Sequence, residues 1–191
     1  VHQLSTSYKV MVLVGQGVWS AGMKKQLQQL AELPQFTVLT EATSNLDEPG
    51  FITCIDRVIE GVNASNEADL KPDVLITFGG AIVSKRIKGL LRKWKPAQHW
   101  HVDADQRYHD TYQSLTHDIA VEPHLFLAQL EGQVKGNESL YGEAWRMVDA
   151  RMREKHQRIL KEAPFCDLSV FETLLDRIPE VSEMRVGIFT R

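Results

Sequence analysis

The sequence predicts an α/β fold: a Rossmann-like, doubly wound parallel sheet of about five to six strands in three αβα layers, with a C-terminal helical extension. Two observations lead to this prediction. Residues 74–78 form a short apolar run between a Pro-Asp and a Gly-Gly dipeptide, as in a strand covered on both faces. Residues 83–94 then repeat apolar side chains at helical spacing, and residues 100–102 begin a second buried strand. Together they form one strand–helix–strand unit of a parallel sheet.

The first part of the chain supplies two more strands and a helix. Residues 9–14 and residues 36–39 are apolar runs that predict strands. Between them, Ser20 is placed to cap a helix whose apolar residues end before Pro34. Residues 43–50 are rich in Ser, Asn, Asp, Pro and Gly, and such loops often carry function.

The alternation of strands and helices continues beyond these elements. Residues 55–59 predict a short helix before the central unit, residues 118–121 a last short strand, and residues 125–130 a helix. Strands that alternate with helices are typical of a doubly wound sheet with right-handed crossovers.

The last third of the chain differs from the rest. Residues 141–160 and 168–178 predict two helices, and residues 185–190 a strand-like tail without an evident partner. We therefore expect a Rossmann-like domain over residues 1–135 and a helical linker over residues 136–191. Two interpretations of the linker stay open: a bridge into a further domain, or a terminal pair of packed helices.

Composition narrows the classes of function. At 191 residues and 43% hydrophobic residues, the chain is long enough for one buried core. A net charge of −3 gives no support for general attraction to nucleic acid or membranes. No apolar run approaches the roughly 20 residues that cross a bilayer. Two cysteines and no recognisable signal peptide favour a reducing compartment, so we expect a cytoplasmic protein.

The main candidate for a binding site is the turn between the central strand and its helix. Gly79 and Gly80 let a ligand approach the backbone, and the N–H groups of a helix start favour an anion. Lys85 and Arg86 lie in the first helical turn, where the helix dipole disfavours cations unless a negative group is near. An acidic ligand or a carboxylate from another chain would supply that group; a solvated basic face is the alternative.

Arg107 is the best single candidate for contacting a carboxylate. It follows the strand that contains His99 and His101, and loops at the carboxyl ends of parallel strands line the binding crevice. An ordinary salt bridge is the alternative. The two histidines share a face at a spacing that can bind a metal, but no third ligand is evident. Imidazoles packed at a sheet or subunit interface are therefore favoured, and no metal site is expected.

Other chemical motifs are weak or missing. Gly15 and Gly17 follow the first strand, but the third glycine, Gly22, comes too late for a dinucleotide-binding turn. The sequence contains no phosphate-binding loop, nucleophile elbow or zinc-protease motif. The residues by themselves therefore name no catalytic group.

Three segments give the chain a family resemblance. They are PDVLITFGGAIVSKRIKGLLRKWKPAQHWHVDADQRYHD at residues 72–110, FITCIDRVIEG before it, and a W-x-x-x-D-x-R-x-R-E-K helix after it. In this order they resemble the central domain of the 2-succinyl-5-enolpyruvyl-6-hydroxy-3-cyclohexene-1-carboxylate synthase family, thiamine diphosphate-dependent enzymes of menaquinone biosynthesis. The resemblance covers about residues 9–180.

The resemblance implies a larger parent enzyme, a transferase that decarboxylates 2-oxoglutarate and adds the succinyl-semialdehyde unit to isochorismate. A pyrimidine-binding domain would precede this chain and a pyrophosphate-binding domain would follow it. Those domains would hold thiamine diphosphate and Mg²⁺, because the family's Gly-Asp-Gly signature and cofactor-activating Glu are missing here. We therefore expect no cofactor in this chain, no catalytic residue, no activity of the chain by itself, and a parent that is a homo-oligomer.

For some members the resemblance also implies a regulatory site for 1,4-dihydroxy-2-naphthoate, in which Arg107 matches the position of one arginine. The chain would then be a scaffold first and a regulatory domain second. The rival interpretation is a stand-alone Rossmann-like module that binds a nucleotide or an acidic metabolite in a crevice near Gly15, Gly79 and Arg107.

Overall fold

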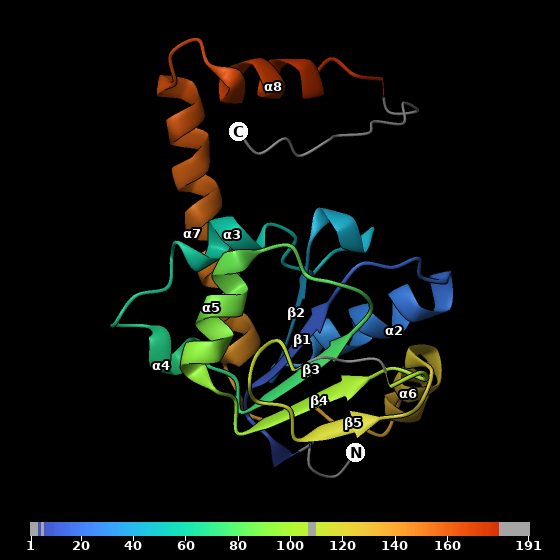
Figure 1. Ribbon diagram of the computed structural model, residues 1–191. Helices are drawn as coiled ribbons and strands as arrows, with labels where there is room; N and C mark the ends of the chain where they lie inside the picture. The colour runs from blue at the N-terminus through green and yellow to red at the C-terminus, as the bar shows by residue number, and fades with distance from the viewer. Residues whose placement is uncertain (1–3, 5, 107–109, 180–191) are drawn as a thin grey trace. The chain divides into compact units, whose positions relative to one another are not determined.

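A five-stranded parallel sheet forms the centre of the protein. The structure is a computed structural model that describes residues 4, 6–106 and 110–179. The strand order is β2-β1-β3-β4-β5, and every neighbouring pair runs parallel (Figure 1). The strands are β1 (Val10–Val14), β2 (Phe36–Thr40), β3 (Val74–Phe78), β4 (Gln98–Val102) and β5 (His117–Ile119). The predicted α/β fold is therefore confirmed, with a strand number inside the expected range.

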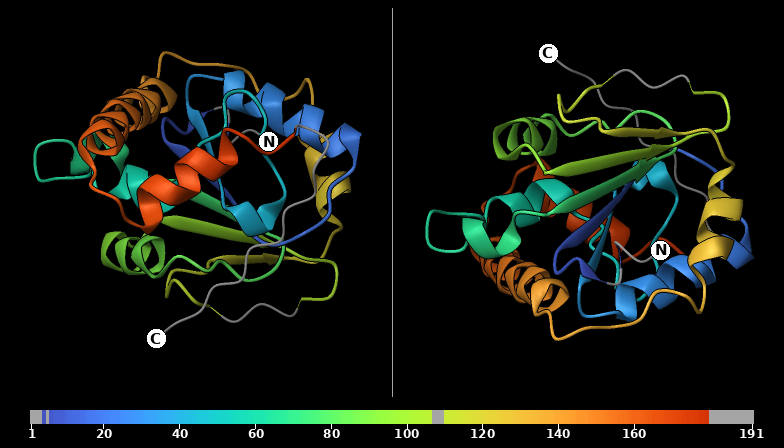
Figure 2. Two further views of the ribbon diagram at one scale, coloured as in Figure 1. Left: turned by 90° about the horizontal axis from the view of Figure 1, so that it is seen from above. Right: turned by 90° about the horizontal axis from the view of Figure 1, so that it is seen from below.

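Helices cover both faces of this sheet. In chain order they are α2 (Ala21–Glu32), the 3-10 helix η1 (Ala42–Ser44), α3 (Ile55–Ile59), α4 (Glu67–Leu70), α5 (Lys85–Trp94), α6 (Pro123–Leu130), α7 (Tyr141–Glu162) and α8 (Asp167–Leu175). Helices α2 and α6 lie on one face, whereas α3, α5 and the first half of α7 lie on the other (Figure 2). This is the three-layer arrangement that the sequence predicts.

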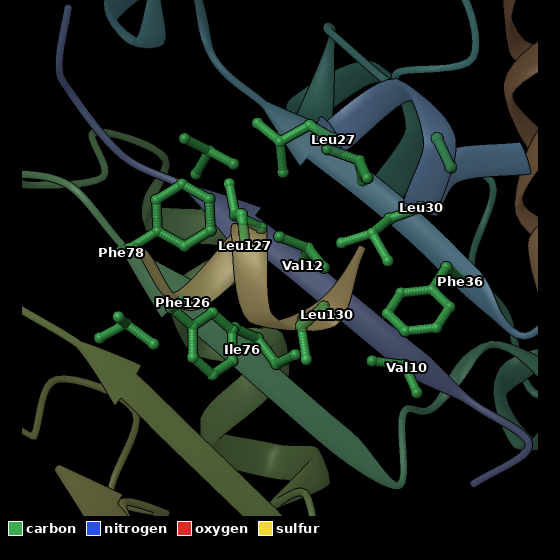
Figure 3. Packing of buried hydrophobic residues seen from close by; sticks show 14 of the residues in the cluster. Val10, Val12, Leu27, Leu30, Phe36, Ile76, Phe78, Phe126, Leu127 and Leu130 are labelled. Atoms are coloured by element: carbon green, nitrogen blue, oxygen red, sulfur yellow. The ribbon is translucent and has the colours of Figure 1, made fainter. Parts of the chain in front are cut away.

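The strands read as continuous apolar runs because both faces of the sheet are buried. Val12 and Ile76 belong to a core cluster with Leu27 of α2 and Leu127 of α6 (Figure 3). Leu13, the neighbour of Val12 in β1, points to the opposite face and belongs to the second cluster. Successive strand residues face opposite sides, so a strand covered on both sides must be apolar at every position.

The chain reverses its direction across the sheet between β1 and β3. It passes from β1 to β2 at one edge, returns past β1 to β3, and continues through β4 to β5. In open α/β sheets with such an order, the binding crevice lies outside the carboxyl ends of the strands at this switch point. Gly15 follows β1 there, and Gly79 and Gly80 follow β3.

The chain divides into two compact units, Val1–Met152 and Arg153–Arg191. The first unit thus continues past the boundary expected at residue 135, because the start of α7 belongs to the core. Trp145 is fully buried, and its Nε1–H donates to the Leu70 carbonyl oxygen (3.2 Å). The apolar stripe predicted for this helix therefore packs on the sheet over its first three turns.

The second unit contains the end of α7 and all of α8. Both predicted helices are present, and α8 buries none of its residues. The strand-like segment predicted at residues 185–190 lies outside the described residues. In the part of the chain that the structure describes, no helix has the length and apolar character needed to cross a membrane.

Candidate functional site

A cavity of about 430 Å³ opens at the carboxyl ends of β1, β3 and β4. Its lining includes Gly15 after β1, the turn after β3, Lys88 of α5, and His101 and Asp103 at the end of β4. The volume falls within the roughly 300–1,000 Å³ of small-molecule sites. The cavity lies at the switch point of the sheet, so topology and shape indicate the same place.

The turn formed by Gly79 and Gly80 lines this cavity, and its glycines have a structural reason. Gly79 has a φ of +84°, which other residues rarely adopt. A Cβ on Gly15 would lie 2.0 Å from the Gly80 carbonyl oxygen, so the ends of β1 and β3 approach closely. The Gly80 N–H donates to the Gln16 carbonyl (2.7 Å), and the Gly15 N–H to the Phe78 carbonyl (2.9 Å). These two N–H groups therefore already have acceptors within the chain.

The start of α5 holds a carboxylate that comes from this chain. Glu41, directly after β2, accepts hydrogen bonds from the Val83 and Ser84 N–H groups, both at 2.7 Å. Ser84 caps the helix: its Oγ accepts from the Ile87 N–H (3.1 Å) and donates to Asp56 of α3. The helix dipole favours negative groups at this end. Glu41 and Asp56 of this chain thus lie where a negative group from an acidic ligand or another chain is expected from the sequence.

The three cations in the first half of α5 have different surroundings. Arg86 forms an ion pair with Glu60 at the end of α3. Lys85 is exposed and does not line the cavity. Lys88 lines the cavity, and its Nζ donates to the Ile82 carbonyl (3.1 Å). Lys88 is not among the site residues predicted from the sequence. Its position three residues after Lys85, on the same side of the helix, is the feature that could have identified it.

Two buried histidines of β4 share one hydroxyl group beside the cavity. Thr77 Oγ1 lies 2.9 Å from His99 Nε2 and 2.9 Å from His101 Nδ1. Burial lowers the pKa of His99 to about 4, although the charge of Asp110 acts to raise it, and burial also lowers the pKa of His101. Both rings are therefore neutral at pH 7. Since the Thr77 hydroxyl has a single proton, it donates to one ring and accepts from the other.

Arg107, the predicted carboxylate contact, lies outside the described residues. The residues on both sides of it in sequence do reach the site: Asp103 and Tyr112 line the cavity. The Tyr112 ring also meets the His99 ring edge to face, with centroids 5.6 Å apart. Asp103 and Tyr112 are thus part of the candidate site.

The described residues do not fit a thiamine diphosphate–magnesium unit. No group of three or more His, Cys, Asp or Glu side chains among them could hold a metal ion. At the start of α5, a diphosphate would meet the Glu41 carboxylate, which repels it. The cavity instead offers Lys88, His101, Asp103 and the backbone of the glycine turn as polar groups for a small molecule.

Comparison with known proteins gives consistent matches. The family described as "Middle domain of thiamine pyrophosphate" matches residues 3–184. The chain is 38% identical over 186 residues to a protein of Flavobacterium johnsoniae named 2-succinyl-5-enolpyruvyl-6-hydroxy-3-cyclohexene-1-carboxylate synthase, with 96% of this chain and 33% of that protein covered. Proteins of the same name match in Christiangramia forsetii (35% identity; 97% and 33% covered) and Flavobacterium psychrophilum (34% identity; 98% and 34% covered).

The chain spans about a third of the length of the curated relatives it matches. Within that third the match is nearly complete, and the parallel sheet between two helical layers agrees with it. The resemblance seen in the sequence is therefore confirmed: this chain belongs to the family of thiamine pyrophosphate enzyme middle domains.

Proposed function

We propose that this chain is the central, non-catalytic domain of a transferase of menaquinone biosynthesis. The parent would decarboxylate 2-oxoglutarate and add the succinyl-semialdehyde unit to isochorismate, with thiamine diphosphate and Mg²⁺ bound by its other domains. The observation that carries the proposal is the match to synthases of this name over 96% of the chain but only 33% of the relative. The parent would be a cytoplasmic homo-oligomer.

The contacts at the switch point support a structural role for this domain. Glu41 joins the end of β2 to the start of α5, and Gly15 and Gly80 join the ends of β1 and β3. Acceptors within this chain thus already bind backbone N–H groups at the positions where Rossmann-like folds commonly bind a phosphate. On this proposal, the domain contributes to catalysis by holding its neighbours in place, while the cofactor supplies the carbanion chemistry.

The test compares the complete coding sequence with residues 1–191. Both proteins are given 2-oxoglutarate, isochorismate, thiamine diphosphate and Mg²⁺, and CO₂ release and product formation are measured. We expect turnover only by the complete protein, and only with the cofactor and both substrates present. Turnover by the 191-residue chain, or a complete protein that ignores isochorismate, would contradict the proposal.

A second role, binding of an acidic regulator, is favoured by the cavity at the switch point. Gly79, Gly80 and Lys88 line it, and Arg107 remains the candidate carboxylate contact. Calorimetric titration with 1,4-dihydroxy-2-naphthoate should give heat that Arg107→Ala and Lys88→Ala reduce. Lys85→Ala is the matched control, because that side chain lies outside the lining. No heat, or heat unchanged in the first two variants, would exclude this role. Binding of ATP or NAD alone would favour the stand-alone module.

A further inference from the structure

A second groove, of about 540 Å³, lies where residues 8–9 pass the start of α7. Three large apolar side chains line it and are largely exposed: Tyr8 (58%), Leu140 (71%) and Met147 (66%). Single exposed apolar residues are ordinary, but several around one groove are typical of an interaction site. The groove belongs entirely to the first unit of the chain.

The start of α7 carries two apolar stripes rather than one. Tyr141 and Trp145 belong to the stripe that packs on the sheet. Leu140, Ala144 and Met147 form a second stripe at helical spacing, and all three line the groove. Packing within the described chain accounts for the first stripe. In the second stripe, Ala144 is partly buried against the same core, whereas Leu140 and Met147 are left exposed beside the groove.

The rim of the groove is acidic. The lining contains three carboxylates, those of Asp69, Glu138 and Glu143, and one ammonium group, that of Lys9. The Lys9 Nζ donates to the Ala68 carbonyl (2.7 Å). None of these three carboxylates forms an ion pair with a described residue. A second copy that bound symmetrically through this surface would bring the same carboxylates together, and like charges repel. A partner of different charge fits better.

We propose that in the complete protein this groove is covered by a segment outside residues 1–191 that is apolar at its centre and carries Lys or Arg at its flanks. The inference rests on the proposed function, because it requires a longer parent, and the chain covers only 33% of its relative from Flavobacterium johnsoniae. The apolar centre covers Leu140 and Met147, while the basic flanks face the rim carboxylates. Interfaces commonly combine an apolar core with a polar rim of complementary charge.

Cysteine labelling tests whether the groove is covered. In a background with Cys54→Ser and Cys166→Ser, Met147→Cys is introduced into both the 191-residue chain and the complete protein, and the rate of maleimide labelling is measured. We expect labelling at least about tenfold slower in the complete protein, because a covered thiol reacts only after local opening. Val18→Cys, at a 94% exposed position outside the groove, is the control for reagent access and should react alike in both. Equal rates at position 147 would overturn the inference.

Charge reversal tests the chemistry of the partner. Asp69→Lys with Glu143→Lys in the complete protein should restore fast labelling of the Met147→Cys variant, whereas Glu122→Lys, on an exposed residue outside the groove, should not. If Met147→Cys is still labelled slowly after the double charge reversal, the covering segment does not carry the proposed basic flanks. Turnover is measured on the same protein, so that the two proposals can fail separately. Slow labelling at position 147 in a complete protein that does not consume 2-oxoglutarate would contradict the proposed reaction but support the covered groove.

Discussion

Acidification should destabilise this protein through the buried histidines of β4. His99 is fully buried, and burial lowers its pKa to about 4, below the ordinary value of 6.5. Between pH 6.5 and pH 4, the unfolded chain therefore binds a proton at this residue that the folded chain does not. Stability rises with pH wherever the unfolded state binds more protons, so it falls as the pH is lowered through this window.

The size of this effect follows from the two pKa values. Each unit of difference corresponds to about 1.4 kcal/mol. Lowering the pH from 7 to 4.5 should thus remove about 2 kcal/mol of unfolding free energy through His99 alone. His101 acts in the same direction, because burial lowers its pKa as well. The loss is a large fraction of the roughly 5–15 kcal/mol by which domains are stable.

Urea denaturation followed by tryptophan fluorescence at pH 7, 6, 5 and 4.5 measures the effect. His99→Gln keeps a side chain that can bond the Thr77 hydroxyl but cannot titrate, so the variant should lose about 2 kcal/mol less than wild type across this range. His124→Gln, which removes an exposed imidazole of α6, is the control for the same substitution outside β4. If His99→Gln loses as much unfolding free energy as wild type, His99 is not the source and the reasoning is refuted.

Three further predictions test the framework by urea denaturation at pH 7. Gly15→Ala should lower the unfolding free energy by about 1–3 kcal/mol, because its Cβ would lie 2.0 Å from a backbone oxygen, whereas Gly89→Ala, in open space on α5, should raise it by about 0.5–1 kcal/mol. Equal effects of the two would contradict the close approach of β1 and β3. Trp145→Phe should cost about 2 kcal/mol through a lost hydrogen bond and a small cavity, and no cost would mean that α7 contributes little to the core. Glu41→Ala should cost about 1–3 kcal/mol, since two N–H groups at the start of α5 lose their acceptor; an unchanged midpoint would show that water replaces it fully.

Local patterns in the sequence predict most of the helices and strands of the fold. The predicted strands at residues 9–14, 36–39 and 74–78 correspond to β1, β2 and β3 within one residue at each end. Ser20 caps α2 as expected, with the Met23 N–H donating to its Oγ (3.2 Å). These features depend on residues that are close in sequence, which is why periodicity and capping rules detect them.

The electrostatics of the candidate site could not be predicted in the same way. Glu41 and Val83 are 42 residues apart, and only the strand order β2-β1-β3 brings the end of β2 to the start of α5. No local pattern in the sequence determines the order of the strands. Similarly, the apolar stripe of residues 141–152 indicates a helix that packs, but the pattern does not say on which core, so the first unit extends further than expected.

Glu41 also sets the charge at the start of α5, where Val83 follows the cavity-lining residue Ile82. An incoming anion gains little from the dipole of α5, because a fixed negative charge already occupies that end of the helix. An acidic group of a ligand would instead be met by Lys88, which lines the cavity. A nucleotide diphosphate that extended to the start of α5 would be repelled by the Glu41 carboxylate. We therefore expect a nucleotide diphosphate to bind in this cavity more weakly than a ligand with a single acidic group.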